Sequence, residues 1–138
     1  MSLLNFARTD IVTITPEASV LEAANLMTAK NVGCLVVVEN GKPMGILTDR
    51  DIVIRVVKRE CDPVQTATCD VMTKDPITLG EELGLFEALE IVKEHGVRRF
   101  PVVDPDGVLT GFFSIDDVLY LLGIELSAVA RIIDQESP

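Results

Sequence analysis

The sequence contains no tryptophan, one tyrosine and five phenylalanines, so aromatic residues make up only 4% of its 138 residues. The hydrophobic content of 48% must therefore come mainly from aliphatic side chains, and it is sufficient for the core of one domain of common size. The chain has three cysteines, Cys34, Cys61 and Cys69, and no CxxC spacing among them. This pattern disfavours a disulfide framework or a zinc site, and it favours a reducing, cytoplasmic compartment.

Basic residues are scarce as well, because 12 Lys+Arg face 22 Asp+Glu and give a formal net charge of -10. Nucleic acids and anionic membrane surfaces both attract proteins through Lys and Arg. No secretory signal is recognisable, and no apolar stretch reaches the roughly 20 residues that a membrane span needs. We therefore expect no nucleic acid and no membrane as partners. A small phosphorylated ligand stays compatible with the composition, because a few local arginines can outweigh the global charge.

What the sequence does contain is an internal repeat. The stretch "SVLEAANLMTAKNVGCLVVV" aligns with "GLFEALEIVKEHGVRRFPVV", so that Glu22 falls on Glu87 and Val32 on Val97. After a turn, "NGKPMGILTDRDI" aligns with "DGVLTGFFSIDDV" once a single insertion in the second turn is allowed. Two copies of one supersecondary unit are therefore predicted.

Each copy predicts the same order of elements. A short strand comes first, then an amphipathic helix, an apolar strand, a turn with Asn-Gly or Asp-Gly, another strand and a second helix. The expected strands are Ile11–Thr15 and Met44–Leu47 in the first copy, and Ile77–Leu79 and Leu109–Phe113 in the second, with second helices starting near Thr48 and Ser114. The predicted fold is α/β (α+β), with two β-α-β-β-α repeats packed sheet to sheet with pseudo-two-fold symmetry, plus a C-terminal helix.

The expected boundaries follow from the repeat. They are residues 6–60 for the first repeat, 61–70 for a polar, proline-containing linker, 71–122 for the second repeat, and 123–138 for a last amphipathic helix and tail. A unit of this size is only marginally stable alone, so the two repeats should bury each other's exposed face. The last helix could pack on the domain or on a second copy of the chain.

Both copies carry Gly-x-x-(Ser/Thr)-x-x-Asp, as Gly45, Thr48 and Asp51 and as Gly111, Ser114 and Asp117. One interpretation is structural: Ser or Thr with an acidic residue three positions later is close to a capping box, and Asp suits the start of a helix. The other is a ligand site, because a helix N-terminus can receive a phosphate and a carboxylate can hold a ribose diol. Glycine at the first position would let a neighbouring segment lie close to the strand.

Two adjacent arginines, Arg98 and Arg99, precede the apolar strand of the second copy, where the first copy has Gly33 and Cys34. They either balance the acidic helices as surface charge or clamp a phosphate. Because consecutive residues entering a strand point to opposite faces, the two side chains should have different surroundings.

The stretches "VMTKDPITL", "VRRFPVVDPDGVLTGFFSIDDV" and "NVGCLVVVENGKPMGILTDRDI" resemble the cystathionine-beta-synthase (CBS) domain, and two in tandem resemble a CBS pair, or Bateman module. The resemblance extends from about Phe6 to Leu122. It implies a regulatory module that binds an adenosyl ligand in clefts between the repeats. The Ser/Thr of the motif would then contact phosphate, and the Asp would hold the ribose.

Carried over residue by residue, the resemblance implies two mixed clefts. The first would combine Thr48, Asp51, Asp75, Pro76, Ile77, Arg98 and Arg99, and the second would combine Ser114, Asp117, Asp10, Ile11, Val12, Gly33 and Cys34. The arginines fall in the first cleft only, so that cleft is expected to prefer the more phosphorylated ligand. The implied ligand is AMP, ADP, ATP or S-adenosylmethionine, with Mg²⁺ a candidate companion of a polyphosphate; we expect no catalytic cofactor and no metal-ligating residues.

Three hypotheses of function follow. The leading one is a stand-alone sensor without enzymatic activity, which works as a homodimer and reports ligand state to an unidentified protein partner. The alternative is a structural dimerisation or protein-interaction module without a ligand. An enzyme is the weakest of the three, because the chain has no Ser/His/Asp or Cys/His arrangement and one histidine, His95.

Overall fold

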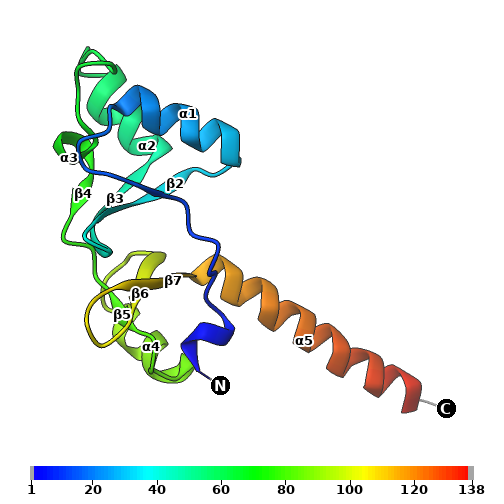
Figure 1. The fold of residues 1–138 in the computed structure, drawn as a ribbon. Coiled ribbons are helices and arrows are strands. Elements are labelled where there is room, and N and C mark those ends of the chain that lie inside the picture. The colour runs from blue at the N-terminus through cyan, green and yellow to red at the C-terminus, as the bar shows by residue number, and fades with distance from the viewer. Residues whose placement is uncertain (1, 137–138) are drawn as a thin grey trace.

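The computed structural model describes residues 2–136 and contains two β-sheets that lie between helices (Figure 1). The first sheet has the strand order β1-β2-β3-β4, with β1 Thr13–Ile14, β2 Cys34–Glu39, β3 Lys42–Thr48 and β4 Thr73–Lys74. The second has the order β5-β6-β7, with β5 Leu79–Gly80, β6 Arg99–Val103 and β7 Leu109–Ser114. In each sheet a parallel pair is followed by an antiparallel pair. This arrangement confirms the predicted class of two β-α-β-β-α repeats.

The helices follow the same repeat. They are η1 Leu3–Asn5, α1 Val20–Lys30, α2 Asp49–Ile52 with a π-helical continuation η2 Val53–Val57, α3 Thr68–Val71, α4 Leu85–Val92 and α5 Ile115–Glu136. Helix α1 begins with a complete capping box between Ser19 and Glu22, whereas α4 begins at Gly84 without a side-chain cap. Asn31, which caps the C-terminus of α1, and Gly96, which ends the turn after α4, both have left-handed backbones, with φ of 53° and 61°.

Helix α5 differs from the prediction. A last helix was expected to follow Leu122-Gly123, but α5 runs without a break from Ile115 to Glu136. One glycine inside a helix costs only about 1 kcal/mol relative to alanine, so good helix formers on both sides can carry the helix through Gly123. The C-terminal part of α5 projects away from the sheets (Figure 1), and all residues from Leu122 to Glu136 are exposed. Residues 137 and 138 of the expected tail lie outside the described residues.

None of the described helices combines the length and the apolar character that crossing a bilayer would require.

The two hairpins show how turn residues set the strand register. Asn40 and Gly41 both have positive φ, 52° and 78°, between the paired residues Glu39 and Lys42. That is the two-residue turn that Asn-Gly favours. The second hairpin has a longer turn, in which the carboxylate of Asp104 accepts hydrogen bonds from two backbone N–H groups.

Each repeat contributes its N-terminal segment to the core of the other. Val71 and Met72, which precede the second repeat's first strand, lie in the core of the first repeat beside Leu35 and Leu47. Leu3 lies in the core of the second repeat, fully buried among residues such as Phe100 and Phe113. The exchange makes the two cores depend on one another, and it carries residues near the N-terminus to the second motif.

Candidate functional site

The glycines of the repeated motif make room for the exchanged segments. A Cβ at Gly45 would lie 2.2 Å from the Sδ atom of buried Met72. A Cβ at Gly111 would lie 3.3 Å from both the Ala7 Cβ and the Arg8 carbonyl oxygen. The expectation that these glycines let neighbouring segments lie close is therefore confirmed.

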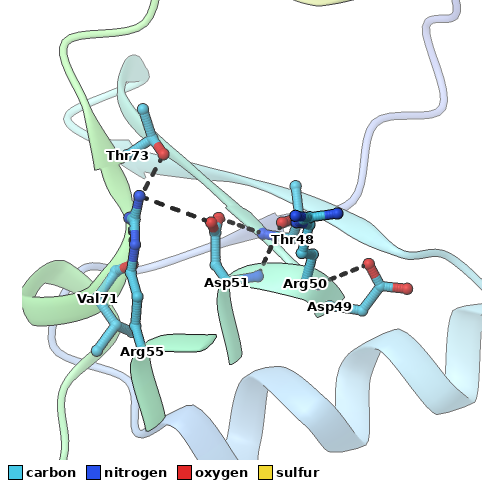
Figure 2. Close-up of polar contacts among 7 residues, drawn as sticks. All are labelled: Thr48, Asp49, Arg50, Asp51, Arg55, Val71 and Thr73. Atoms are coloured by element: carbon cyan, nitrogen blue, oxygen red, sulfur yellow. Dashed lines mark hydrogen bonds and ion pairs between the residues drawn. The ribbon is translucent and has the colours of Figure 1, made fainter. Parts of the chain in front are cut away.

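The first motif forms a capping box at the start of α2 (Figure 2). The Oγ1 atom of Thr48 accepts a hydrogen bond from the Asp51 N–H at 3.1 Å, and the Thr48 N–H donates to Asp51 Oδ2 at 3.0 Å. The second carboxylate oxygen of Asp51 lies 3.8 Å from Nη2 of Arg55, one turn further along the helix. The cap therefore uses one oxygen of Asp51, and the other oxygen makes only a long ion pair with Arg55.

Arg55 joins this motif to the segment that precedes the second repeat. Its Nη1 donates to the Val71 carbonyl oxygen at 2.8 Å and reaches Thr73 Oγ1 at 3.5 Å (Figure 2). Asp75 has a left-handed backbone with φ of 50°, and its N–H donates to the Met44 carbonyl oxygen at 3.2 Å. Pro76 and Ile77, which follow it, are half-buried. The structure thus places Thr48, the last residue of β3, on the same sheet as β4, which leads directly to Asp75, and it places Asp51 in the helix that follows β3.

The second motif is arranged differently. The Oγ atom of Ser114 accepts a hydrogen bond from the Asp116 N–H at 3.3 Å. Asp117 instead forms a two-pronged ion pair with Arg8, in which Nε donates to Oδ2 at 2.9 Å and Nη2 donates to Oδ1 at 3.0 Å. This carboxylate is therefore held by a residue from the far end of the chain.

Arg8 is positioned by its own backbone. Its N–H donates to the Phe112 carbonyl oxygen at 2.9 Å, and its carbonyl oxygen accepts from the Phe112 N–H at 2.8 Å. These bonds attach the N-terminal segment to the free edge of β7. The hydrogen bonds and the charge of Asp117 also raise the pKa of Arg8 above its ordinary value.

A cavity of about 260 Å³ lies at this second motif. It is lined by Arg8, Asp10, Ile11, Val12, Val32, Gly33, Cys34, Val36, Arg99, Phe112, Ser114, Asp116 and Asp117. All seven residues assigned to the second cleft are among them, so the structure brings that set together around one space. Aliphatic and aromatic side chains form one part of the wall, and carboxylates, a hydroxyl and two guanidinium groups form the other.

The expected place of the two arginines is wrong on one point. Arg99 lines the second cleft, although both arginines were assigned to the first cleft only. Arg99 pairs with Ser114 across β6 and β7, so it starts its strand beside the second motif. Arg98 forms an ion pair with Asp116, at the start of α5. The alternation of side chains along the strand separates the two residues as expected.

Cys34 is the thiol in the cavity wall. Burial is the main cause that raises its pKa to about 11; nearby Arg99 opposes the rise, and the Asp51 and Asp49 carboxylates contribute to it. The group is therefore a neutral thiol near pH 7 and contributes an apolar surface to the cavity.

Sequence reasoning missed several wall residues, namely Arg8, Val32, Val36, Phe112 and Asp116. Val36 and Phe112 lie on strands that were predicted, and alternation along those strands could have selected them. Arg8 was missed for a different reason, because it meets Asp117 only through the exchange of N-terminal segments. No signal in the neighbouring sequence could have identified it.

The fold and the cleft define a pseudo-symmetric pair of β-α-β-β-α repeats with a mixed site between them. The family model described as "CBS domain" matches residues 4–58 and again residues 68–124. The chain therefore belongs to the CBS domain family and carries two copies of that domain.

Curated relatives agree with this assignment. The uncharacterized protein MK0525 of Methanopyrus kandleri is 35% identical over 120 residues, which cover 86% of this chain and 61% of that protein. The CBS domain-containing protein YhcV of Bacillus subtilis is 36% identical over 110 residues, which cover 80% of this chain and 77% of that protein. The chain therefore spans less than two thirds of the length of MK0525 and about three quarters of YhcV.

Solved structures share the fold. An uncharacterized conserved protein from Pyrococcus horikoshii has a TM-score of 0.75 at 27% identity, covering 87% of this chain and 90% of that one. The hexameric CBS-CP12 protein from bloom-forming cyanobacteria has a TM-score of 0.75 at 29% identity, covering 87% and 67%. CBSX2 in complex with AMP has a TM-score of 0.73 at 24% identity, covering 90% and 98%.

Proposed function

We propose that this protein is a regulatory sensor without enzymatic activity that binds an adenosyl ligand in the second cleft. The observation that carries the proposal is the cavity of about 260 Å³, in which an apolar wall faces Ser114, Asp117 and two arginines. A base can lie against Ile11, Val12 and Phe112, a ribose diol can bond to the two oxygens of Asp117, and a phosphate can bond to Ser114 and Arg99. The solved CBSX2 complex gives a precedent for AMP on this fold.

Among adenosyl ligands we propose a nucleoside monophosphate. Small-molecule pockets usually measure about 300–1,000 Å³, and this cavity of about 260 Å³ is slightly smaller. Asp10, Asp116 and Asp117 also line it, against Arg8 and Arg99. Three carboxylates opposite two guanidinium groups favour one phosphate over a chain of them, because each further phosphate adds negative charge.

A thermal-shift and calorimetry panel with AMP, ADP, ATP, NAD and S-adenosylmethionine tests the proposal. A ligand at 100 times its dissociation constant should stabilise the protein by about 2.7 kcal/mol. We expect AMP to give the largest shift. No shift with any member of the panel at millimolar concentration would contradict the adenosyl proposal and favour a module without ligand.

We also propose that two copies of the chain form a dimer through α5. In this proposal the dimer is cytoplasmic, and an unidentified protein partner binds it according to whether the ligand is present. Leu119, Leu122, Leu126 and Val129 are exposed and recur at alternating spacings of three and four residues. That spacing is typical of the seam of a coiled coil, where a second helix covers the apolar stripe. A second copy supplies an identical stripe, and symmetric dimers are the commonest oligomers.

Light scattering on the double variant Leu126→Glu with Val129→Glu tests the pairing. We expect a dimer for the parent and a monomer for the variant. Arg131→Glu, which adds negative charge away from the stripe, is the matched control and should remain a dimer. A parent that is monomeric at high micromolar concentration would contradict the pairing.

A further inference from the structure

We infer that Arg8 determines the ligand preference of the second cleft, because it holds the carboxylate that a ribose would need and releases it in exchange for a phosphate. The inference rests on the proposed function and adds a residue that restricts the site to phosphorylated ligands. Three observations support it: the geometry of the ion pair, the anchoring of Arg8, and the contrast with the first cleft.

The ion pair occupies both oxygens of Asp117. Arg8 donates to Oδ2 at 2.9 Å and to Oδ1 at 3.0 Å, so neither oxygen is left with its full capacity for a diol. A ribose that binds Asp117 through both hydroxyls in the two-pronged position that Arg8 holds must therefore displace the guanidinium. The Asp117 side chain is 25% exposed and faces the cavity, so a ligand can reach it.

The displaced guanidinium stays at the site. The two backbone bonds to Phe112 hold the main chain of Arg8 on β7, so only its side chain can turn. That side chain is 62% exposed and also lines the cavity beside Arg99. Arginine recognises phosphate through two parallel N–H bonds, just as it recognises a carboxylate. When a nucleotide displaces Arg8 from Asp117, its phosphate can become the new partner of the guanidinium. A nucleoside displaces Arg8 in the same way but has no phosphate to replace the lost ion pair.

Among the described residues, the first cleft has no two-pronged ion pair like that of Arg8 and Asp117. Asp51 shares one oxygen with the Thr48 N–H, and its nearest guanidinium, that of Arg55, lies 3.8 Å away and donates instead to Val71. The position that aligns with Arg8 is Thr73, which carries no charge. The preference for a phosphorylated ligand should therefore be a property of the second cleft alone.

Isothermal titration of AMP and of adenosine into the parent, Arg8→Gln and Arg8→Lys tests the inference. For Arg8→Gln we expect adenosine to bind up to about fivefold more tightly, because an exposed ion pair no longer competes. AMP should bind about tenfold more weakly, because one charge-assisted bond to phosphate is lost. Arg8→Lys keeps the charge but not the fork, so it should improve adenosine binding and retain most of the AMP affinity.

Arg99→Gln is the matched control inside the same cavity. It should weaken AMP binding without improving adenosine binding, since Arg99 makes no ion pair among the described residues. If Arg8→Gln changes both affinities by the same factor, or changes neither, the inference is overturned while the proposed function stands. If neither ligand binds the parent or Arg8→Gln, the proposed function fails and the inference fails with it.

Discussion

The two repeats share one backbone plan, but the aspartates of their motifs have different partners. In the first repeat, Asp51 completes a local capping box with Thr48 and faces Arg55 of the same helix. In the second, the Ser114 hydroxyl bonds to the Asp116 N–H, and Asp117 pairs with Arg8, 109 residues away in the chain. A motif that occurs twice with the same spacing can therefore serve mainly a local role in one copy and a long-range role in the other.

The residues that begin the equivalent strands β2 and β6 differ as well. Cys34 of the first repeat and Arg99 of the second start equivalent strands, and both line the second cleft. One is a neutral thiol in an apolar wall, and the other is a fixed cation. The pseudo-symmetric fold therefore holds an asymmetric site, and the following variants compare its two halves.

The largest expected difference lies between Asp117→Ala and Asp51→Ala in the presence of AMP. At 100 times the dissociation constant, the parent should gain about 2.7 kcal/mol of stability from the ligand. Asp117→Ala should lose this gain, because the carboxylate in the cavity is removed, while Asp51→Ala should keep it. Urea unfolding with and without AMP measures both. A gain that disappears only in Asp51→Ala would move the site to the first cleft.

The next difference concerns pH and Cys34. Its pKa is raised from 9.0 to about 11, so the folded protein holds the thiol proton more tightly than the unfolded chain does. The resulting stability is fully present below pH 9.0 and is lost as the pH rises toward about 11. The loss should be on the order of 2 kcal/mol, and Cys34→Ala should remove that part of the pH dependence.

Urea unfolding of the parent and of Cys34→Ala between pH 8 and about pH 11 measures this loss. Cys61→Ala, at an exposed thiol, is the control and should follow the parent curve. An identical pH dependence in the parent and Cys34→Ala would show that the thiol is not disfavoured as a thiolate in the folded state.

A smaller difference is expected between the two motif glycines. Gly45→Ala would place a methyl group 2.2 Å from the Sδ atom of buried Met72, so the core must shift. Gly111→Ala meets its neighbours at 3.3 Å, which a slight movement of the N-terminal segment relieves. We expect Gly45→Ala to cost about 1.5 kcal/mol more in unfolding free energy than Gly111→Ala. Equal costs would mean that Met72 has room to move.

The smallest difference is between the two hydroxyls. Thr48→Ala breaks a reciprocal capping box with bonds of 3.1 and 3.0 Å, and should cost about 1 kcal/mol. Ser114→Ala removes a single bond of 3.3 Å and should cost about half as much. Chemical denaturation without ligand measures both. A larger cost at Ser114 would contradict the view that the first motif is the better cap.

Much of this fold could be predicted because its signals are local. The Asn-Gly dipeptide predicted a hairpin turn, and Asn40 and Gly41 form a two-residue turn with positive φ. The interruption expected at Gly123 was wrong, because one glycine cannot end a helix whose flanking residues favour it. The structure brings the seven residues expected in the second cleft around one cavity, and their contact with a ligand stays a prediction.

The surroundings of the arginines could not be predicted from the sequence alone. Arg99 lines the second cleft because the start of its strand pairs with Ser114, and Arg98 turns instead to Asp116. Arg8 was missed because nothing in its neighbourhood along the chain marks it. Its partner becomes visible only when the N-terminal segment is seen on the edge of β7.

By itself the sequence determined the repeat, the order of elements, the turns, the apolar strands and the doubled motif, because each depends on residues close together in the chain. The tertiary structure decided which repeat's segment completes which core and which arginine pairs with which carboxylate. It also decided that the cavity of about 260 Å³ lies at the second motif. These contacts join residues as far apart as Arg8 and Asp117, and no local propensity encodes them. The Arg8–Asp117 contact accompanies the burial of Leu3 in the core of the second repeat, which brings Arg8 to the second motif.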